Sequence, residues 1–174
     1  MNKYRVLVAD DSAFMRKIIS DLIAADVRFE VIDTAKNGKE AVEKAKALRP
    51  DAITMDVEMP EMNGLDALRQ IMAVCPTPVI MLSSLTREGA FETIRALELG
   101  AIDFVCKPSG SISLDLYKVK GELIEKLVAA VGTKHRLKPA ARGEPVSTAS
   151  GVSAGGMPMR GALGMPAPKK KGQK

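Results

Sequence analysis

The chain has 174 residues, which is enough for one well-packed core and an appendage but not for two full domains. Hydrophobic residues make up 46% of it, and no apolar run approaches the roughly 18 residues of a membrane-spanning helix, so no membrane span is expected. The net charge of +5 divides into −3 over residues 1–132 and +8 over residues 133–174, so the main part is mildly acidic and nucleic-acid binding is not expected.

Short apolar runs alternate with amphipathic stretches over the first 131 residues. The runs are too short for helices and predict strands, whereas the stretches have apolar residues at helical spacing and predict helices. In chain order, the predicted units are strand 5–9 with helix 13–24, strand 31–35 with helix 38–49, strand 52–56 with helix 65–74, strand 79–83 with helix 90–99, and strand 102–106 with helix 116–131.

Five strand–helix units in series predict an α/β fold with a doubly wound, five-stranded parallel sheet that helices cover on both faces. Right-handed connections restrict the topology to this arrangement. Such sheets bind ligands beyond the carboxyl ends of their strands. That edge receives the polar residues that end or follow four of the predicted strands, namely Asp10, Asp11, Asp56, Ser83 and Lys107.

Residues 132–174 break the pattern. They are rich in Ala, Gly, Pro and Ser and have no apolar period, which predicts a flexible linker or a disordered basic tail. The tail contains GVSAGG, which superficially resembles the turn around a nucleophilic serine, here Ser153. Such a turn needs a strand before it and a helix after it. Neither is predicted, and the single histidine, His135, lies upstream, so no esterase site is expected there.

The two cysteines, Cys75 and Cys106, are far apart and lack the CxxC spacing of a metal site. A chain with so few cysteines is not a disulfide scaffold. Free thiols in a reducing compartment are therefore expected, and the cytoplasm is the natural location.

Three carboxylates at one sheet edge, from Asp10, Asp11 and Asp56, would repel one another unless a cation neutralised them. Hard oxygen ligands of this kind suit Mg²⁺ together with a phosphate. Lys107 would neutralise charge on a transferred group, and the Ser83 hydroxyl could donate a hydrogen bond to a phosphoryl oxygen. The combination predicts phosphoryl transfer onto an aspartate, in which positioning and charge neutralisation supply most of the catalysis.

Each of these residues also has a purely structural interpretation. Asp10 and Asp11 could cap the first helix, and Asp56 could begin a loop through an Asx-turn. Ser83 could be a helix cap, and Lys107 could be a solvated surface lysine. The functional interpretation is favoured because all four positions fall on one edge, each after a different strand.

Four separated segments, VLVADDS, ITMDVEMPEMNG, VIMLSS and GAIDFVCKP, resemble the signature motifs of two-component receiver domains. The resemblance covers roughly residues 3–131 and implies the flavodoxin-like receiver fold. It implies that Asp56 is the phosphoacceptor and that Asp10 and Asp11 bind Mg²⁺ with it. It also implies that Glu58, two residues after the phosphoacceptor, adds its backbone carbonyl to the metal.

The same resemblance assigns roles to three residues of the later strands. It implies that Ser83 is the switch hydroxyl, that Phe104 is the aromatic switch, and that Lys107 contacts the phosphoryl group. The Lys107–Pro108 bond is then a candidate cis peptide, a form found almost only before proline.

The phrases SSLT, GAIDFV and KPSGSISL are more specifically similar to the N-terminal regulatory half of chemotaxis protein-glutamate methylesterases. This similarity implies phosphorylation by the chemotaxis histidine kinase. In that family a linker joins the receiver to an esterase that acts on chemoreceptor glutamates, and phosphorylation relieves inhibition of the esterase. The expected organisation is a receiver over residues 1–131 and a linker or tail over 132–174 without an esterase domain.

The leading hypothesis is therefore a phosphorylation-dependent chemotaxis response regulator. Three alternatives remain open from the sequence. One is a stand-alone single-domain receiver, and a second is a Mg²⁺-dependent phosphatase that forms an aspartyl-phosphate, with Glu58 as the acid two residues after the nucleophile. The third is an interaction module whose acidic edge binds Mg²⁺ without chemistry.

Overall fold

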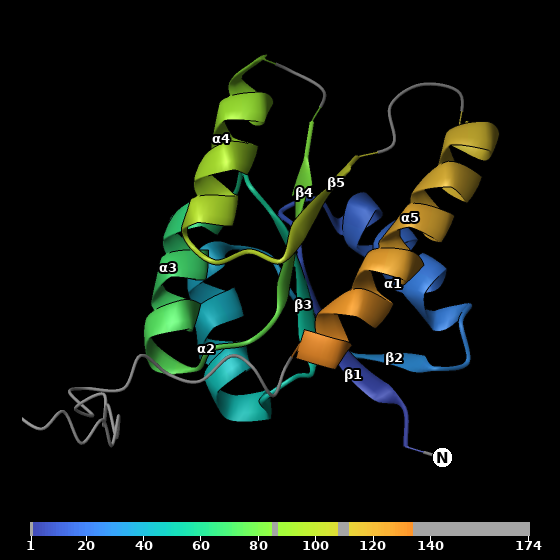
Figure 1. Cartoon of the computed structure of the whole chain (residues 1–174), viewed down its shortest axis with the longest axis horizontal. Helices are drawn as coiled ribbons and strands as arrows, with labels where there is room; N and C mark the ends of the chain where they lie inside the picture. Colours follow the sequence, from blue (N-terminus) through green and yellow to red (C-terminus); the bar gives the residue numbers. More distant parts are fainter. Residues whose placement is uncertain (1, 85–86, 108–111, 134–174) are drawn as a thin grey trace, which may run out of the picture. The chain divides into compact units, whose positions relative to one another are not determined.

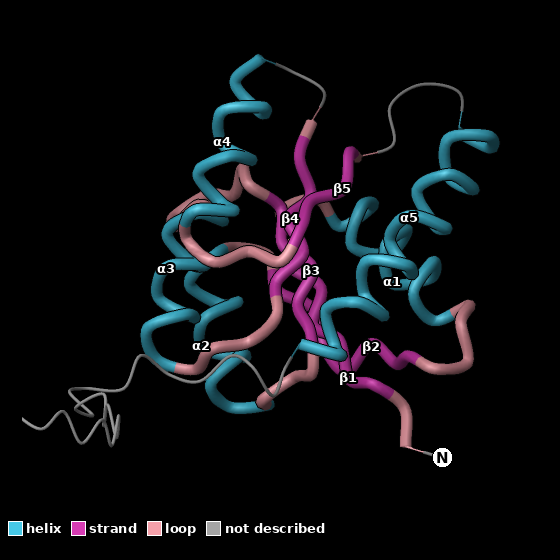
Figure 2. The backbone as a smooth tube through the Cα atoms, viewed as in Figure 1, coloured by secondary structure: helices cyan, strands magenta, loops and turns pink. Residues whose placement is uncertain are grey.

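The computed structural model describes residues 2–84, 87–107 and 112–133, which form a parallel sheet between two layers of helices (Figures 1 and 2). The sheet order is β2-β1-β3-β4-β5. The strands are β1 (Tyr4–Ala9), β2 (Phe29–Ala35), β3 (Ala52–Asp56), β4 (Val79–Ser83) and β5 (Asp103–Cys106). The helices are α1 (Ala13–Ala24), α2 (Gly38–Leu48), α3 (Gly64–Val74), α4 (Arg87–Glu98) and α5 (Ile112–Thr133). The predicted α/β fold and its five parallel strands are confirmed.

The element boundaries differ from the prediction mainly at their starts. The strand β2 begins two residues early because Phe29 continues the parallel pairing, opposite Tyr4. The two rings lie 5.8 Å apart, a contact between distant parts of the chain that no local pattern reveals. Helices α4 and α5 begin three and four residues before the predicted starts, at Arg87 and Ile112. A helical backbone can extend beyond its apolar stripe, and the stripe was the signal used.

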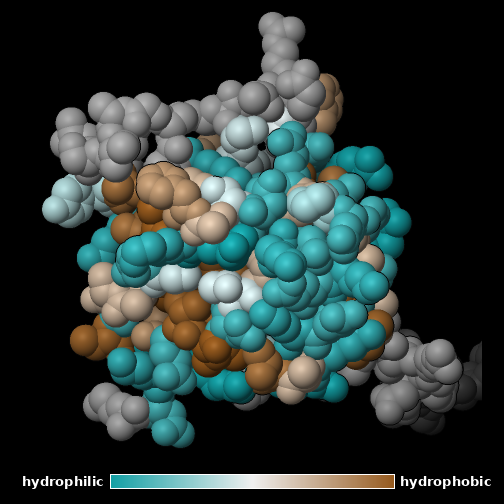
Figure 3. Space-filling view, turned by 180° about the vertical axis from the view of Figure 1, so that it is seen from behind, coloured by the Kyte–Doolittle hydropathy of each residue, from teal (hydrophilic) through white to brown (hydrophobic). Residues whose placement is uncertain are grey.

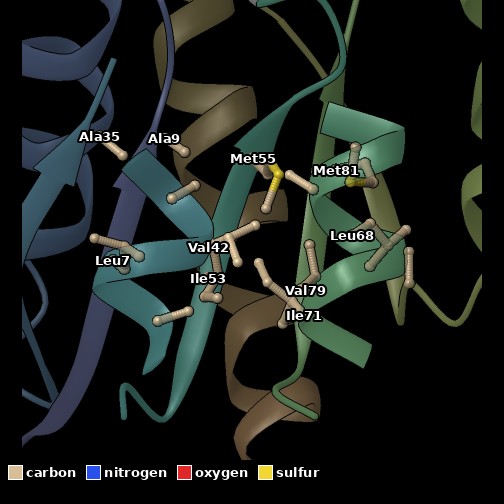
Figure 4. Close-up of a cluster of buried hydrophobic side chains, with 14 of the residues drawn as sticks. Leu7, Ala9, Ala35, Val42, Ile53, Met55, Leu68, Ile71, Val79 and Met81 are labelled. Atoms are coloured by element: carbon tan, nitrogen blue, oxygen red, sulfur yellow. The ribbon is translucent and has the colours of Figure 1, made fainter. Parts of the chain in front are cut away.

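Alternate residues of each strand serve opposite faces of the sheet, as the pleat requires. In β1, Leu7 and Ala9 pack with α2, α3 and α4, whereas Val6 and Val8 pack with α1 and α5. Figure 4 shows the first of these two cores, where side chains from the strands and from α2 and α3 meet. Both faces are thus closed by helices, which leaves the ends of the strands as the place where polar groups can gather.

Asparagine and serine side chains fix the start of three helices just beyond the carboxyl ends of strands. Ser12 caps α1 by accepting from the Met15 N–H, and Asn37 caps α2 by accepting from the Glu40 N–H. Asn63 caps α3 by accepting from the Asp66 N–H at 2.9 Å. Each cap satisfies a backbone donor that the first helical turn leaves without a partner. The loops at this sheet edge are therefore held at both ends.

The remaining expectations about individual residues have mixed outcomes. Cys75 and Cys106 are free thiols, as predicted. Among the helices that the structure describes, none combines the length and the apolar character needed to cross a bilayer. The Lys107–Pro108 bond, Ser153 and the rest of residues 134–174 lie outside the described residues, so the expected cis peptide and the expected tail stay predictions. On the face shown in Figure 3, polar residues predominate and apolar side chains form smaller patches.

Thr54 in β3 offers a test of how the core tolerates a polar group. Its hydroxyl is fully buried and has no hydrogen-bond partner among the described residues. Thr54→Val keeps the shape and removes the unsatisfied group, so we expect the free energy of unfolding to rise by about 1 kcal/mol. The measurement is urea unfolding followed by far-UV circular dichroism.

A matched control exists at Thr77, which is also buried but donates to the Cys75 carbonyl at 2.7 Å. Thr77→Val should lower the free energy of unfolding by about 1 kcal/mol, because it leaves that carbonyl without the donor. Equal effects of the two substitutions would show that the Thr54 hydroxyl is satisfied after all.

Candidate functional site

The candidate site lies at the carboxyl end of the sheet, where four strands deliver polar residues. Asp56 and Ser83 are the last residues of β3 and β4, while Asp10 and Lys107 directly follow β1 and β5. The sheet order reverses direction between β1 and β3, which is the point where open parallel sheets bind their ligands. Asp10 and Asp56 therefore flank the switch point, and they lie at the sheet edge that the strand pattern predicted.

Lys107 joins the two buried carboxylates. Its ammonium nitrogen lies 2.6 Å from Oδ2 of Asp56 and 3.1 Å from Oδ2 of Asp10. Both aspartates are almost completely buried, with 0% and 4% of Asp10 and Asp56 exposed. Asp11 is exposed, and one carboxylate oxygen from each of the three aspartates lies within 4.8 Å of the others. The three carboxylates and the Lys107 ammonium together have a formal charge of −2, and the Arg16 guanidinium lies close by, donating to the backbone carbonyls of Asp10 and Asp11.

Burial governs the acidity of these groups. It raises the pKa of Asp56 to about 6, and the charge of Asp10 adds to the increase, while the hydrogen bond from Lys107 opposes it. Burial also raises the pKa of Asp10. For Lys107, burial works against the charged form, but the hydrogen bond to Asp56 and the two carboxylate charges outweigh it and raise the pKa. At neutral pH the site therefore contains an ammonium and an excess of carboxylate charge.

The same residues fit a divalent metal ion. Oδ2 of Asp10 is buried, and among the described residues its partner is the Lys107 ammonium, in an ion pair at 3.1 Å. Such an atom retains a lone pair for a cation. Carboxylate oxygens are the ligands that Mg²⁺ prefers, and a divalent ion would balance the charge of −2. Glu58 donates its backbone N–H to Oδ1 of Asp56 at 3.3 Å, and the role of its carbonyl as a metal ligand stays a prediction.

The structural interpretations of these residues can now be weighed. Helix α1 is capped by the Ser12 hydroxyl, while Asp10 accepts the Ser12 N–H at 2.9 Å and keeps its other oxygen in the cluster. Lys107 is paired with two aspartates and is not a solvated surface lysine. Asp56 does accept the Glu58 N–H, the contact of an Asx-turn, but it also pairs with Lys107. The geometry therefore favours a shared functional edge over four unrelated local roles.

The two predicted switch residues lie on neighbouring strands, Ser83 at the end of β4 and Phe104 within β5. Ser83 is buried, and its hydroxyl lies 3.3 Å from the hydroxyl of Thr93 in α4. Phe104 is half-buried against the core beneath α2 and α3, and the ammonium of Lys126 in α5 lies 5.0 Å from its ring centroid. Sequence reasoning missed both Thr93 and Lys126, because each is a polar residue in an ordinary amphipathic helix and its partner is a strand residue.

Gly64 is a further residue whose importance the sequence did not reveal beyond its place in a turn. Its N–H donates to the Val57 carbonyl at 2.8 Å. A Cβ atom at this position would lie 2.0 Å from the carbonyl oxygen of Asp56. Only a residue without a side chain can let α3 begin so close to the candidate nucleophile. The Asn63-Gly64 pair was the available signal, because these residue types favour turns, but the residue types do not reveal the tight contact.

The comparisons with known proteins identify relatives of the chain. The sequence pattern of the response regulator receiver domain matches residues 6–116. A protein-glutamate methylesterase/protein-glutamine glutaminase from Geobacillus kaustophilus is 54% identical over 171 residues, which cover 90% of this chain and 49% of that protein. The chain therefore spans about half the length of this curated relative.

Solved structures agree with the sequence relatives. The response regulator domain of Thermotoga maritima CheB is 55% identical, with a TM-score of 0.69, and the match covers 75% of this chain and 98% of that domain. A structure of the P1 domain of CheA3 in complex with CheY6 from R. sphaeroides contains a chain 36% identical to this one, with a TM-score of 0.62 and coverage of 76% and 99%.

The close approach of Gly64 to Asp56 predicts a large effect of adding one methyl group. Gly64→Ala should lower the free energy of unfolding by about 1–3 kcal/mol, because the backbone of β3 or α3 must shift. The matched control is Gly121→Ala in α5, where a Cβ would meet nothing within 4 Å. That substitution should raise stability by about 0.5–1 kcal/mol. Urea unfolding of both variants checks the pair, and a neutral Gly64→Ala would contradict the packing.

The raised pKa of Asp56 predicts a pH-dependent stability. Between its ordinary value of 3.8 and about 6, the folded protein holds a proton that the unfolded chain has lost, so stability falls as pH rises through this window. Asp56→Asn removes this loss. In chelator-treated buffer, the variant should be more stable than the wild type by about 1–3 kcal/mol at pH 7.5, with the gap closing toward pH 4. Urea unfolding at several pH values measures it.

Asp26 provides a control of opposite sign. Hydrogen bonds from Arg28 lower its pKa to about 2, so it stabilises the fold above its unfolded value of 3.8 and loses this contribution as pH falls toward 2. Asp26→Asn should therefore be less stable than the wild type at neutral pH. If Asp56→Asn, like Asp26→Asn, lowered stability at neutral pH, the conclusion that the buried carboxylate cluster destabilises the fold would be refuted.

Proposed function

The chain belongs to the response regulator receiver domain family, and on this basis we propose that Asp56 accepts a phosphoryl group from a histidine kinase of chemotaxis signalling. The observation that carries the proposal is the Lys107 ammonium held between buried Asp10 and Asp56 at the sheet edge. A carboxylate kept ionised, buried and next to a cation is a positioned nucleophile.

The proposed chemistry is a direct phosphoryl transfer. A carboxylate oxygen of Asp56 attacks the phosphorus of a phosphohistidine and forms a P–O bond. The P–N bond breaks, and its electron pair stays on the imidazole, which takes up a proton from water. The product is an acyl phosphate on Asp56. The Lys107 ammonium, already 2.6 Å from Asp56, is placed to pair with the added phosphoryl oxygens.

Asp10, Asp11 and Asp56 are the side chains that would hold Mg²⁺, with the Glu58 carbonyl as a further ligand. When bound, the ion would supply charge neutralisation for the phosphoryl group, which otherwise approaches a cluster with a formal charge of −2. The three aspartates then divide the work. Asp56 would react, whereas Asp10 and Asp11 would serve only as metal ligands.

The proposed response is a change of the surface formed by α4, β5 and α5. Ser83 and Phe104 would move toward the new phosphoryl group and alter what this surface presents to a partner. Three large apolar side chains on α4 are already exposed, namely Phe91, Ile94 and Leu97. They offer contact area for a protein partner next to the switch residues.

The partners and the cellular setting belong to the proposal: the relatives support the partners, and the two free cysteines support a reducing compartment. The related chain that is bound to a P1 domain of CheA3 supports a histidine kinase as the phosphoryl donor. The methylesterase relatives support regulation of an esterase that acts on chemoreceptors, which would concern a longer protein than residues 1–174. We place this activity in the cytoplasm, with residues 1–131 as the receiver and 132–174 as linker or tail.

An aspartyl-phosphate phosphatase is less well supported. Such an enzyme needs a second acid beside the nucleophile to protonate the leaving group. The Glu58 side chain is exposed, and its described contact with Asp56 is made by the backbone N–H. The geometry around Asp56 therefore favours a switch that keeps its phosphoryl group over a hydrolase that turns over small esters.

The proposal predicts Mg²⁺-dependent labelling of Asp56. With a phosphorylated kinase P1 domain as donor, the wild type should take up radioactive phosphate in a hydroxylamine-sensitive form. Asp56→Asn should reduce incorporation by at least roughly 100-fold, because an amide is not a nucleophile for this transfer. Scintillation counting of the protein band cut from a gel measures the incorporation of radioactive phosphate.

The matched control is Asp66→Asn, which changes an exposed aspartate in the first turn of α3. It should label like the wild type. Labelling that survives Asp56→Asn would refute the assignment of the phosphoacceptor. Rapid turnover of small phosphate esters by the wild type would favour the phosphatase instead.

A further inference from the structure

Thr93 is not among the site residues that the sequence predicted, but its hydroxyl contacts one of them, Ser83. It lies in α4, is almost fully buried, and its Oγ1 is 3.3 Å from Oγ of Ser83. The same oxygen is 2.8 Å from the carbonyl of Gly89, one turn earlier. The pair joins α4 to the last residue of β4, next to the candidate phosphoacceptor.

Counting protons gives the direction of this hydrogen bond. The Thr93 hydroxyl has one proton, and a carbonyl oxygen can only accept. The shorter contact, at 2.8 Å, takes that proton, so Thr93 donates to Gly89. The 3.3 Å contact between the two hydroxyls is then a hydrogen bond only with Ser83 as the donor and Thr93 as the acceptor. Ser83 also has a single proton. While that proton is directed at Thr93, it cannot be donated to a phosphoryl group on Asp56.

The neighbouring strands hold the backbone around Ser83, so we expect only its side chain to move. Leu82 pairs with Asp56 in the parallel ladder, and the Ser83 carbonyl accepts the Lys107 N–H at 2.8 Å. Both strands can keep these bonds while Ser83 turns about χ1, since rotamer changes need no change in the ladder. Ser83 can therefore point to α4 or toward Asp56, but not to both.

We propose that Thr93 is a positioning residue that holds the Ser83 hydroxyl on α4 before phosphorylation. This inference rests on the proposed function of Asp56. Phosphorylation then has to break the Ser83–Thr93 hydrogen bond. The free energy of that bond opposes activation, and its loss releases the contact between α4 and β4. Thr93 thereby sets part of the free-energy difference between the resting and the phosphorylated conformation.

The position of Thr93 on α4 connects this contact to the protein surface. Gly89, Thr93 and Ala96 are buried on the side of α4 that packs alongside β4 (Figure 1). Phe91 and Ile94 lie on the opposite, exposed side of the same turns. Loss of the bond at Thr93 would therefore loosen the helix whose outer face carries the exposed apolar side chains.

The test is a titration with beryllofluoride, a mimic of the acyl phosphate, in saturating Mg²⁺, followed by backbone amide NMR. Thr93→Val keeps the shape but cannot accept from Ser83. It should lower the half-saturating beryllofluoride concentration by about 5-fold, the value of one ordinary hydrogen bond. Thr93→Ser retains the hydroxyl and should stay within about 2-fold of the wild type on the same basis.

A double-mutant cycle separates positioning from general packing. In a Ser83→Ala background, Thr93→Val should have no further effect, because the bond it removes is already absent. An equal effect of Thr93→Val in both backgrounds would refute the proposal, as would an unchanged titration in the single variant. If the wild type showed no Asp56-dependent beryllofluoride binding, the proposed function itself would be refuted.

A measurement on the wild type covers the case of a Thr93→Val variant that does not fold. The Thr93 methyl resonance should shift on saturation with beryllofluoride, because its hydroxyl loses the Ser83 donor. An unshifted Thr93 methyl in a protein whose Lys107 amide does shift would refute the hydrogen-bond switch while leaving Asp56 as the phosphoacceptor.

Discussion

The ion pair that Lys107 makes with Asp10 and Asp56 is the interaction on which the site depends. Burying two carboxylates costs free energy, and a single ammonium compensates for only part of it. The site is therefore a place where stability is given up for chemistry. Burial raises the pKa of Asp56 and the charge of Asp10 adds to the increase, and the same excess of negative charge would attract a divalent cation to this edge.

A rigid frame is what allows such a charge cluster to persist. Two apolar cores, one on each face of the sheet, hold the strands, and three capped helices begin at the edge. Gly64 and Gly38 let neighbouring loops approach to distances that no side chain would permit. Asn37 also donates to Glu61 across two loops, at 3.3 Å. The loops that contain the carboxylates are thus held by packing and by hydrogen bonds outside the carboxylate cluster.

The site reaches outward through two polar contacts on different helices. Ser83 meets Thr93 of α4, and Phe104 lies beneath the ammonium of Lys126 of α5. Lys126 is in turn held by Glu122, at 2.8 Å, and by Asp103. Each contact joins a strand residue to the helix that follows its strand, so both helices are tied to a residue for which we propose a switch role. Hydrogen bonds and cation–π contacts suit this role because each is worth only about 0.5–1.5 kcal/mol and can be exchanged at modest cost.

The sequence by itself determined the fold class, the order of elements and the polar edge. Periodicity identifies short apolar strands and amphipathic helices, and in a parallel sheet the strand ends that carry Asp56, Ser83 and Lys107 must converge. Only the tertiary structure decided which of these groups touch. That Lys107 bridges two aspartates, that Ser83 bonds Thr93 and that Gly64 abuts Asp56 depends on side-chain directions set by packing between distant segments. The local sequence pattern does not determine these directions, because the neighbours of a side chain in the folded protein select its rotamer.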